Sequence, residues 1–123
     1  MAASRIPQIE EILRELELTT SQVEASAVVS VEGLPICSAM PLGVDDGILA
    51  AMTATILSVA ERAAGELARG KLNRVLVEGE DGYFIISSAG REAILAVLTK
   101  SKANLGMVFL AMDRACEQIS KLI

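Results

Sequence analysis

Few residues in this chain of 123 could carry out chemistry, and they do not form a known catalytic set. Histidine is absent, which excludes histidine acid–base catalysis, Ser-His or Cys-His nucleophiles and histidine metal ligands. Cys37 and Cys116 belong to no CxxC motif, so we expect buried reduced thiols, with a single disulfide between them as the alternative. Ser87 and Ser88 are adjacent in the sequence, but no residue can be named as the general base that a serine nucleophile needs. The sequence therefore predicts a protein that is not an enzyme, with no catalytic residues.

The segment of residues 65–72, GELARGKL, comes close to a phosphate-binding P-loop but lacks its defining features. It is one residue short, and Leu72 replaces the hydroxyl residue that should follow the lysine. A P-loop also leads from a strand into a helix, whereas this segment leaves a helix for a strand. We therefore expect Gly70 to end that helix in a left-handed conformation. Acidic residues occur singly or in solvated runs, so that neither a cofactor nor a metal is predicted.

Composition and charge narrow the class of protein further. The hydrophobic fraction of 52% predicts one packed domain spanning residues 1–123, with residues 1–5 frayed. The net charge of −5 and the scarcity of aromatic residues disfavour nucleic-acid binding. The N-terminus has no apolar core of a signal peptide, and the longest uncharged run is shorter than the ~20 residues that span a bilayer. We expect a soluble cytoplasmic protein without direct membrane insertion.

The residue pattern predicts three helices and five strands. The helices are expected at residues 6–22, at residues 45–69 and after a capping Asn104, and the strands at residues 25–32, 36–40, 72–78, 83–89 and 92–100. Short connections make the strands antiparallel neighbours, and strands that are apolar on both faces require a sheet covered on both sides. The expected architecture is an α/β fold of the α+β type. It is a three-layer sandwich with the second helix on one face and the other two helices on the opposite face.

The predicted helix of residues 45–69 is unusual because no charge occurs between Asp46 and Glu61. Asp45 or Asp46 can cap its first turn. At ~100° per residue, its larger side chains gather on one side, which we expect to face the sheet: Ile48, Leu49, Met52, Ile56, Val59, Ala63 and Leu67. The opposite side carries a seam of small residues, Gly47, Ala51, Ala54 and Ser58.

Two interpretations of this small-residue seam are open. Alanines are good helix formers and can simply face solvent. A solvated helix face usually carries Lys and Glu, however, and small residues let two helix backbones approach closely. We favour a seam that packs on a second copy of the chain across a two-fold axis. Glu61, Arg62 and Glu66 follow, either as surface ion pairs or as the rim of a docking site.

Three segments of the chain resemble the roadblock family, which is named for a dynein light chain. They are SVEGLPICSA at residues 30–39, the second helix with the two following strands at residues 50–90, and AILAVLTKSKANLGMVFLAMDRACEQI at residues 93–119. The order and spacing of these segments carry the resemblance, which covers nearly the whole chain. The sequence is most similar to prokaryotic single-domain members of the family, whose fold is related to profilin and longin domains.

The resemblance implies a five-stranded antiparallel sheet and a homodimer, or a heterodimer, with paired second helices on one face. It also implies that the strand after the second helix meets its mate across the dimer. The dimer contacts carried over from the family are Gly47, Ala51, Ala54, Ser58, Arg74 and Leu76. The family fixes no motif for the partner contacts, and we assign these to the charged residues Glu61, Arg62 and Glu66. Family members regulate or scaffold small Ras-like GTPases through the paired helices, or serve as light-chain subunits of motor or trafficking complexes. A small-molecule-sensing or structural light-chain-type module is the alternative.

Overall fold

The computed structural model describes residues 5–39 and 43–123 and confirms the predicted order of elements. The helices are α1 (Ile6–Thr19), α2 (Asp46–Glu66) and α3 (Leu105–Ser120). The strands are β1 (Val23–Ser30), β2 (Pro35–Ala39), β3 (Val75–Gly79), β4 (Gly82–Ser88) and β5 (Ala93–Thr99). The expected fraying at residues 1–4 and the expected last residue of the second strand, Met40, lie outside the described residues.

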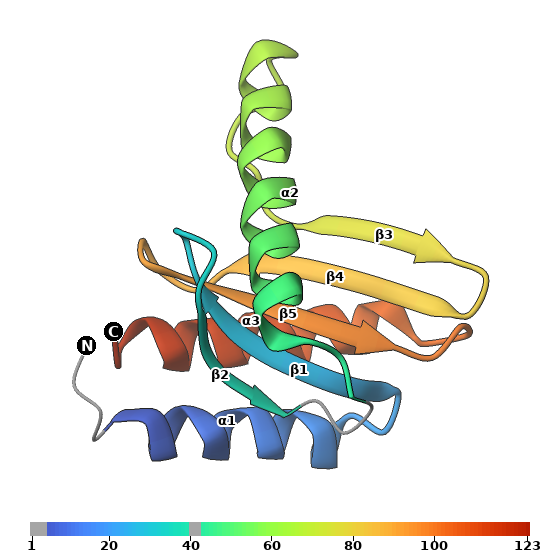
Figure 1. Cartoon of the computed structure of the whole chain (residues 1–123). Helices are drawn as coiled ribbons and strands as arrows, with labels where there is room; N and C mark the ends of the chain where they lie inside the picture. The colour runs from blue at the N-terminus through green and yellow to red at the C-terminus, as the bar shows by residue number, and fades with distance from the viewer. Residues whose placement is uncertain (1–4, 40–42) are drawn as a thin grey trace.

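The five strands form one antiparallel sheet in the order β2-β1-β5-β4-β3. Figure 1 shows the three layers, with α1 and α3 behind one face of the sheet and α2 crossing the other. Each face has its own core because side chains alternate along a strand. Val28, Leu95 and Val97 pack with α1 and α3, whereas Val29 and Ile94 pack with α2. The predicted fold class is thus confirmed.

The two expected helix caps are present. The Asp45 side chain accepts a hydrogen bond from the backbone N–H of Ile48 at 3.0 Å, and the neighbouring Asp46 accepts one from the Ser38 hydroxyl at 2.8 Å. Asn104 caps α3 by accepting a hydrogen bond from the N–H of Met107 at 3.2 Å. Each capping side-chain oxygen satisfies an N–H group that the first turn of a helix leaves free.

The face of α2 that meets the sheet differs from the predicted one. The residues of α2 that the sheet buries are Leu49, Ala50, Thr53 and Leu57, with Ala54 half-buried beside them. The prediction that Ile48, Met52, Val59, Ala63 and Leu67 face the sheet is wrong, because all five are exposed. Small residues at the contact let the helix lie close to the sheet and to the β1–β2 turn. A Cβ atom at Gly33 in that turn would stand only 3.5 Å from the Ala51 Cα.

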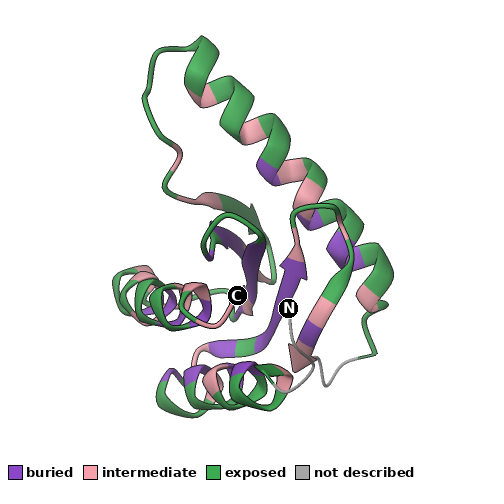
Figure 2. Ribbon diagram, turned by 90° about the vertical axis from the view of Figure 1, so that its left-hand side faces the viewer, coloured by how far each residue is buried: buried purple, intermediate pink, exposed green. Residues whose placement is uncertain are grey.

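The second half of α2 extends past the β3 edge of the sheet, as Figures 1 and 2 show. No residue of α2 after Leu57 is buried. Judged by length and composition alone, α2 is also long and apolar enough to cross a bilayer, which the count of uncharged residues did not indicate. In this fold its first half packs on the sheet, and the second half presents apolar side chains without cover from the described residues.

The left-handed residue that ends α2 is Ala68. Gly70 is left-handed as expected, with a φ of 83°, but it lies beyond the end of the helix. Ala68 has a φ of 53°, its N–H donates to the Gly65 carbonyl at 3.2 Å, and the Arg69 N–H donates to the Ala64 carbonyl at 2.8 Å. These two bonds are the pair that defines a Schellman motif. An L-residue with a side chain is disfavoured in this left-handed conformation, by about 1 kcal/mol relative to glycine.

Ala68→Gly is therefore expected to stabilise the protomer. Removing the Cβ relieves the left-handed strain, although glycine also loses more backbone entropy on folding. The net gain should be about 0.5–1 kcal/mol in the free energy of unfolding, measured by urea denaturation. Gly65→Ala is the matched control. It makes the reverse substitution, glycine to alanine, at a helical position with open space around it. An Ala68→Gly variant that is less stable than wild type would contradict this account.

Candidate interaction surface

The outward face of α2 carries a stripe of exposed residues at helix-packing intervals. We call it the outer stripe: Ile48, Met52, Thr55, Val59, Arg62 and Glu66, at successive spacings of four, three, four, three and four. Ile48, Met52 and Val59 are 60%, 48% and 64% exposed. Alternating steps of three and four residues keep side chains on one side of a helix, which is the spacing of helix-to-helix contacts. The outer stripe can therefore pack against another helix.

The predicted small-residue seam divides between the two sides of α2. Gly47, Ala51 and Ser58 are exposed and flank the outer stripe, but Ala54 packs against the protein's own sheet and does not belong with them. The prediction placed the large side chains on the sheet and therefore missed Ile48, Met52 and Val59 as surface residues. Their spacing in the sequence places them on one face of the helix, but it does not indicate whether that face meets the sheet or the solvent.

The last strand of the sheet, β3, has a free edge in the described part of the chain. It pairs only with β4, through a ladder from Val75 opposite Ile86 to Gly79 opposite Gly82. Its side chains alternate between the two layers, so that Leu76 lies on the α3 side and Val77 on the α2 side, each a little over 40% exposed. An unpaired strand edge can extend the sheet into a second chain.

Arg74 precedes β3, and its side chain contacts α3 of the same chain. Its role as a dimer contact stays a prediction. Its guanidinium Nη2 lies 3.0 Å and 3.3 Å from the two carboxylate oxygens of Asp113 on α3. The guanidinium carbon lies 4.3 Å from the centre of the Phe109 ring. Arg74 thus fastens the start of the edge strand to α3 within one chain.

Arg74→Met is expected to loosen the edge strand while the protein stays folded. The ion pair is partly exposed, so the pair and the ring contact together should contribute only ~1 kcal/mol. Hydrogen exchange of the β3 amides should accelerate more than that of the β5 amides, because β5 is held by strands on both sides. Asp113→Asn should give part of the same effect, whereas unchanged β3 exchange in both variants would contradict the tethering role.

Both cysteines are free, so the structure contains no disulfide between Cys37 and Cys116. Burial raises the pKa of the Cys37 thiol to about 11, with a smaller contribution from Glu10. Burial also raises the pKa of Cys116 to about 12, and Asp113 adds to the effect while Arg74 opposes it. Both thiols are therefore neutral at physiological pH and unsuited to nucleophilic attack.

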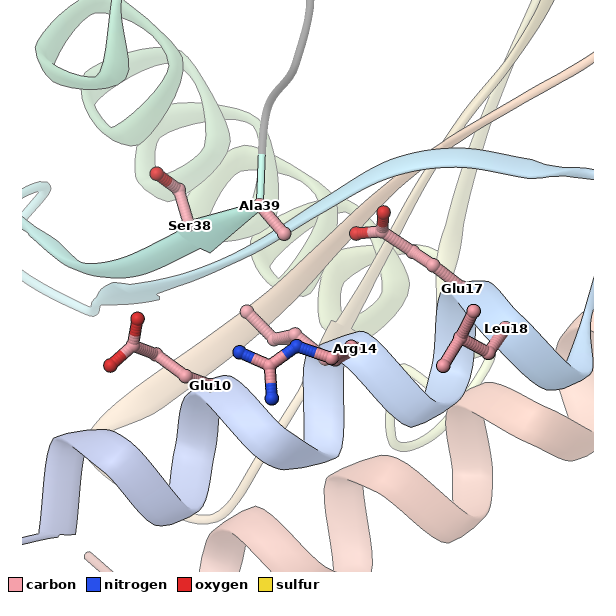
Figure 3. Close-up of a pocket in the computed structure, with 7 residues that line it drawn as sticks. Glu10, Arg14, Glu17, Leu18, Ser38 and Ala39 are labelled. Atoms are coloured by element: carbon pink, nitrogen blue, oxygen red, sulfur yellow. The ribbon is translucent and has the colours of Figure 1, made fainter.

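A groove of about 460 Å³ opens between α1 and the end of β2. Figure 3 shows Glu10, Arg14 and Glu17 on α1, facing Ser38 and Ala39 on β2. Two of its charges are already engaged within the chain, since Arg14 pairs with Glu11 and Glu17 accepts a hydrogen bond from the Ser26 hydroxyl, both at 2.6 Å. No three histidine, cysteine or carboxylate side chains within residues 5–39 and 43–123 gather as metal ligands.

The sequence profile of the Roadblock/LC7 domain family matches residues 8–99. The chain belongs to the roadblock/LC7 family. An uncharacterised protein of Methanocaldococcus jannaschii is 40% identical to it over 114 residues, covering 93% of this chain and 98% of the relative. The resemblance inferred from the three sequence segments is thereby confirmed.

Solved structures support the same fold for this roadblock/LC7 protein. An MglB in a tetrameric arrangement has a TM-score of 0.87 at 20% identity and covers 99% of this chain and 92% of its own. The gliding protein mglB of Thermus thermophilus has a TM-score of 0.85 at 20% identity, covering 99% and 93%. Profilin IA of Acanthamoeba castellanii scores 0.61 at 13% identity, covering 91% and 96%. At these identities the likeness concerns the fold alone, and it confirms the expected profilin-like fold.

Proposed function

We propose that this protein is a non-enzymatic homodimeric regulator or scaffold that binds a small Ras-like GTPase through its paired α2 helices. The observation that carries the proposal is the exposed outer stripe on a helix that extends past a free strand edge. Membership of the roadblock/LC7 family supports the proposal, because the family resemblance implies this dimer and this class of partner.

The dimer follows from placing two free β3 edges side by side. A two-fold axis between the edges joins the two sheets into one, and it lays the extended half of each α2 over the sheet of the other chain. The two α2 helices then run antiparallel, close enough for Met52, Val59 and their neighbours to leave water. Burying an exposed aliphatic side chain stabilises an interface by about 1.5–3 kcal/mol before ordering costs.

The paired helices would form the platform for the GTPase. Glu61, Arg62 and Glu66 stand exposed near the end of α2, with Arg62 and Glu66 in a loose ion pair at 3.5 Å. An ion pair this exposed contributes little to stability. Both side chains are therefore available to a partner. We propose that these three residues contact the GTPase at the rim of the platform. We also propose a cytoplasmic location, which suits an acidic chain with two free thiols.

Two measurements test the proposed function. Light scattering coupled to size exclusion should give the mass of a dimer at micromolar concentration. Purified Ras-like GTPases of the source organism, loaded with GDP or a GTP analogue, should then be titrated against the protein. We expect one of them to bind in one nucleotide state at least ~10-fold more tightly. Glu61→Arg should weaken that binding without altering the dimer, because Glu61 is exposed and lies outside the outer stripe. A dimer that binds none of these GTPases in either state would contradict the proposed partner.

A further inference from the structure

Part of the sheet face that carries α2 is left uncovered by residues 5–39 and 43–123. The residues Val77, Phe84 and Leu98 lie opposite one another on β3, β4 and β5 and form a row across this face. The neighbouring row, with Val75 and Ile86, packs with α2, and the half-buried Phe84 borders the same cluster. Beyond the covered row the surface sinks into a hollow of about 390 Å³, which contains Val77, Phe84 and Leu98 and has the β3–β4 turn at one side.

The open row lies where a second helix beside α2 would sit. Successive residues on one face of a strand are ~7 Å apart, and packed helices lie about 8–10 Å apart. A helix packed alongside α2 is therefore centred over the row of Val77, Phe84 and Leu98 or just past it. In the proposed dimer, that helix is the extended half of α2 from the second copy.

The length of the extended half fits the width of the open surface. About nine residues of α2 follow Leu57, and at ~1.5 Å per residue they reach ~13 Å. Three strands at a spacing of ~4.8 Å span ~14 Å, so the helix of one chain crosses β3, β4 and β5 of the other. Ala60 and Ala64 lie on the underside of this half, in line with Leu57 and Thr53. Their small side chains let the helix settle onto Phe84 and Leu98.

The rim of the hollow and the end of α2 carry opposite charges. Glu24, Glu80 and Asp81 line the hollow and are exposed. Arg69 and Lys71 follow the end of α2 and are exposed as well. The ion pairs formed within the described residues involve none of these five side chains. Complementary charges at an interface favour the correct partner and disfavour a wrong one.

We propose that the hollow over Val77, Phe84 and Leu98 receives the basic end of α2 from a second copy of this chain, and that its acidic rim selects that copy as partner. This inference rests on the proposed dimer and adds the residues that decide which chains can pair. Each dimer contains two such contacts, related by the two-fold axis. A chain with a neutral or basic rim, or with an acidic helix end, would lose the charge match at one of the two contacts with this chain.

A charge-exchange experiment tests the proposal with the full chain. One double variant, E24K/E80K, makes the rim basic, and another, R69E/K71E, makes the helix end acidic. Each should dissociate as a homodimer at least ~10-fold more readily than wild type in analytical ultracentrifugation at low salt. Mixed together they should form a heterodimer close to wild type in affinity, because both contacts are then complementary. The control variant E15K/E92K has the same change of net charge as E24K/E80K but lies away from the hollow, and it should dimerise like wild type.

The outcomes separate this inference from the proposed function. Circular dichroism and thermal melts establish that each variant is folded before its mass is compared. A wild-type chain that is monomeric overturns the dimer and the hollow together. A wild-type dimer whose dissociation constant is the same in both double variants overturns only the placement of the helix end. Weakened homodimers that regain no affinity when mixed also overturn it, because the two charge sets then do not meet.

Discussion

Val59→Arg is expected to convert the proposed dimer into folded monomers. Val59 is 64% exposed in the isolated chain and lies in the middle of the outer stripe, between Thr55 and Arg62. In the proposed antiparallel pair of α2 helices, the change places two arginines at the contact between the helices, where neither forms an ion pair with a carboxylate. Uncompensated charge at a packed contact costs several kcal/mol. We expect the dissociation constant to rise at least ~100-fold, which corresponds to about 2.7 kcal/mol.

Leu18→Arg is the matched control for this change. Leu18 is 77% exposed, and it lies on α1 in the opposite layer of the sandwich. The same substitution there should leave the mass by light scattering unchanged. Ala54→Arg should behave differently from both, because Ala54 packs on its own sheet and the protomer itself should lose stability. A Val59→Arg protein that remains a dimer at low micromolar concentration would show that the outer stripe is not the seam.

Gly82→Ala is expected to have the largest effect on stability of any single substitution proposed for this chain. Gly82 has a φ of 150°, and a Cβ atom at this position would collide with the backbone carbonyl oxygen of Thr99. The backbone at Thr99 cannot move aside easily, because Thr99 pairs with Val23 on β1 and the preceding residue, Leu98, is paired on both sides. Steric overlap with backbone, added to the strain of the positive φ, should cost more than ~3 kcal/mol. Urea denaturation of the purified variant measures this loss.

Gly79→Ala provides the comparison within the same hairpin. Gly79 is the residue opposite Gly82, has no positive φ, and would place its Cβ at an ordinary 3.5 Å from the nearest atom. Its substitution should change the free energy of unfolding by less than ~1 kcal/mol. Gly82→Ala should also expose the β3–β4 hairpin to exchange. Equal stabilities of the two variants would mean that the close approach of residue 82 to the Thr99 carbonyl does not determine the cost of the substitution.

The sequence alone was sufficient for the elements and their arrangement. The periodicity of apolar residues, the short glycine-containing turns and the capping residues Asp45 and Asn104 each act over a few positions, so they can be recognised without knowing the fold. Element ends were less certain, as Ala68 shows. The helix ends there because the backbone adopts a left-handed conformation at Ala68, two residues before Gly70, the residue that the sequence predicts as the helix end.

The orientation of α2 was decided only by the tertiary structure. Leu49 and Leu57 face the sheet while Ile48, Met52 and Val59 face outward, because the small residues Ala50 and Ala54 permit close contact with the sheet and the β1–β2 turn. On a helix that is apolar nearly all round, hydrophobicity cannot choose between faces. The placement of Arg74 on Asp113, 39 residues away, is equally invisible to local pattern. The sequence determined that α2 is apolar on more than one side, and the packing of the other described elements determined which of those sides is exposed.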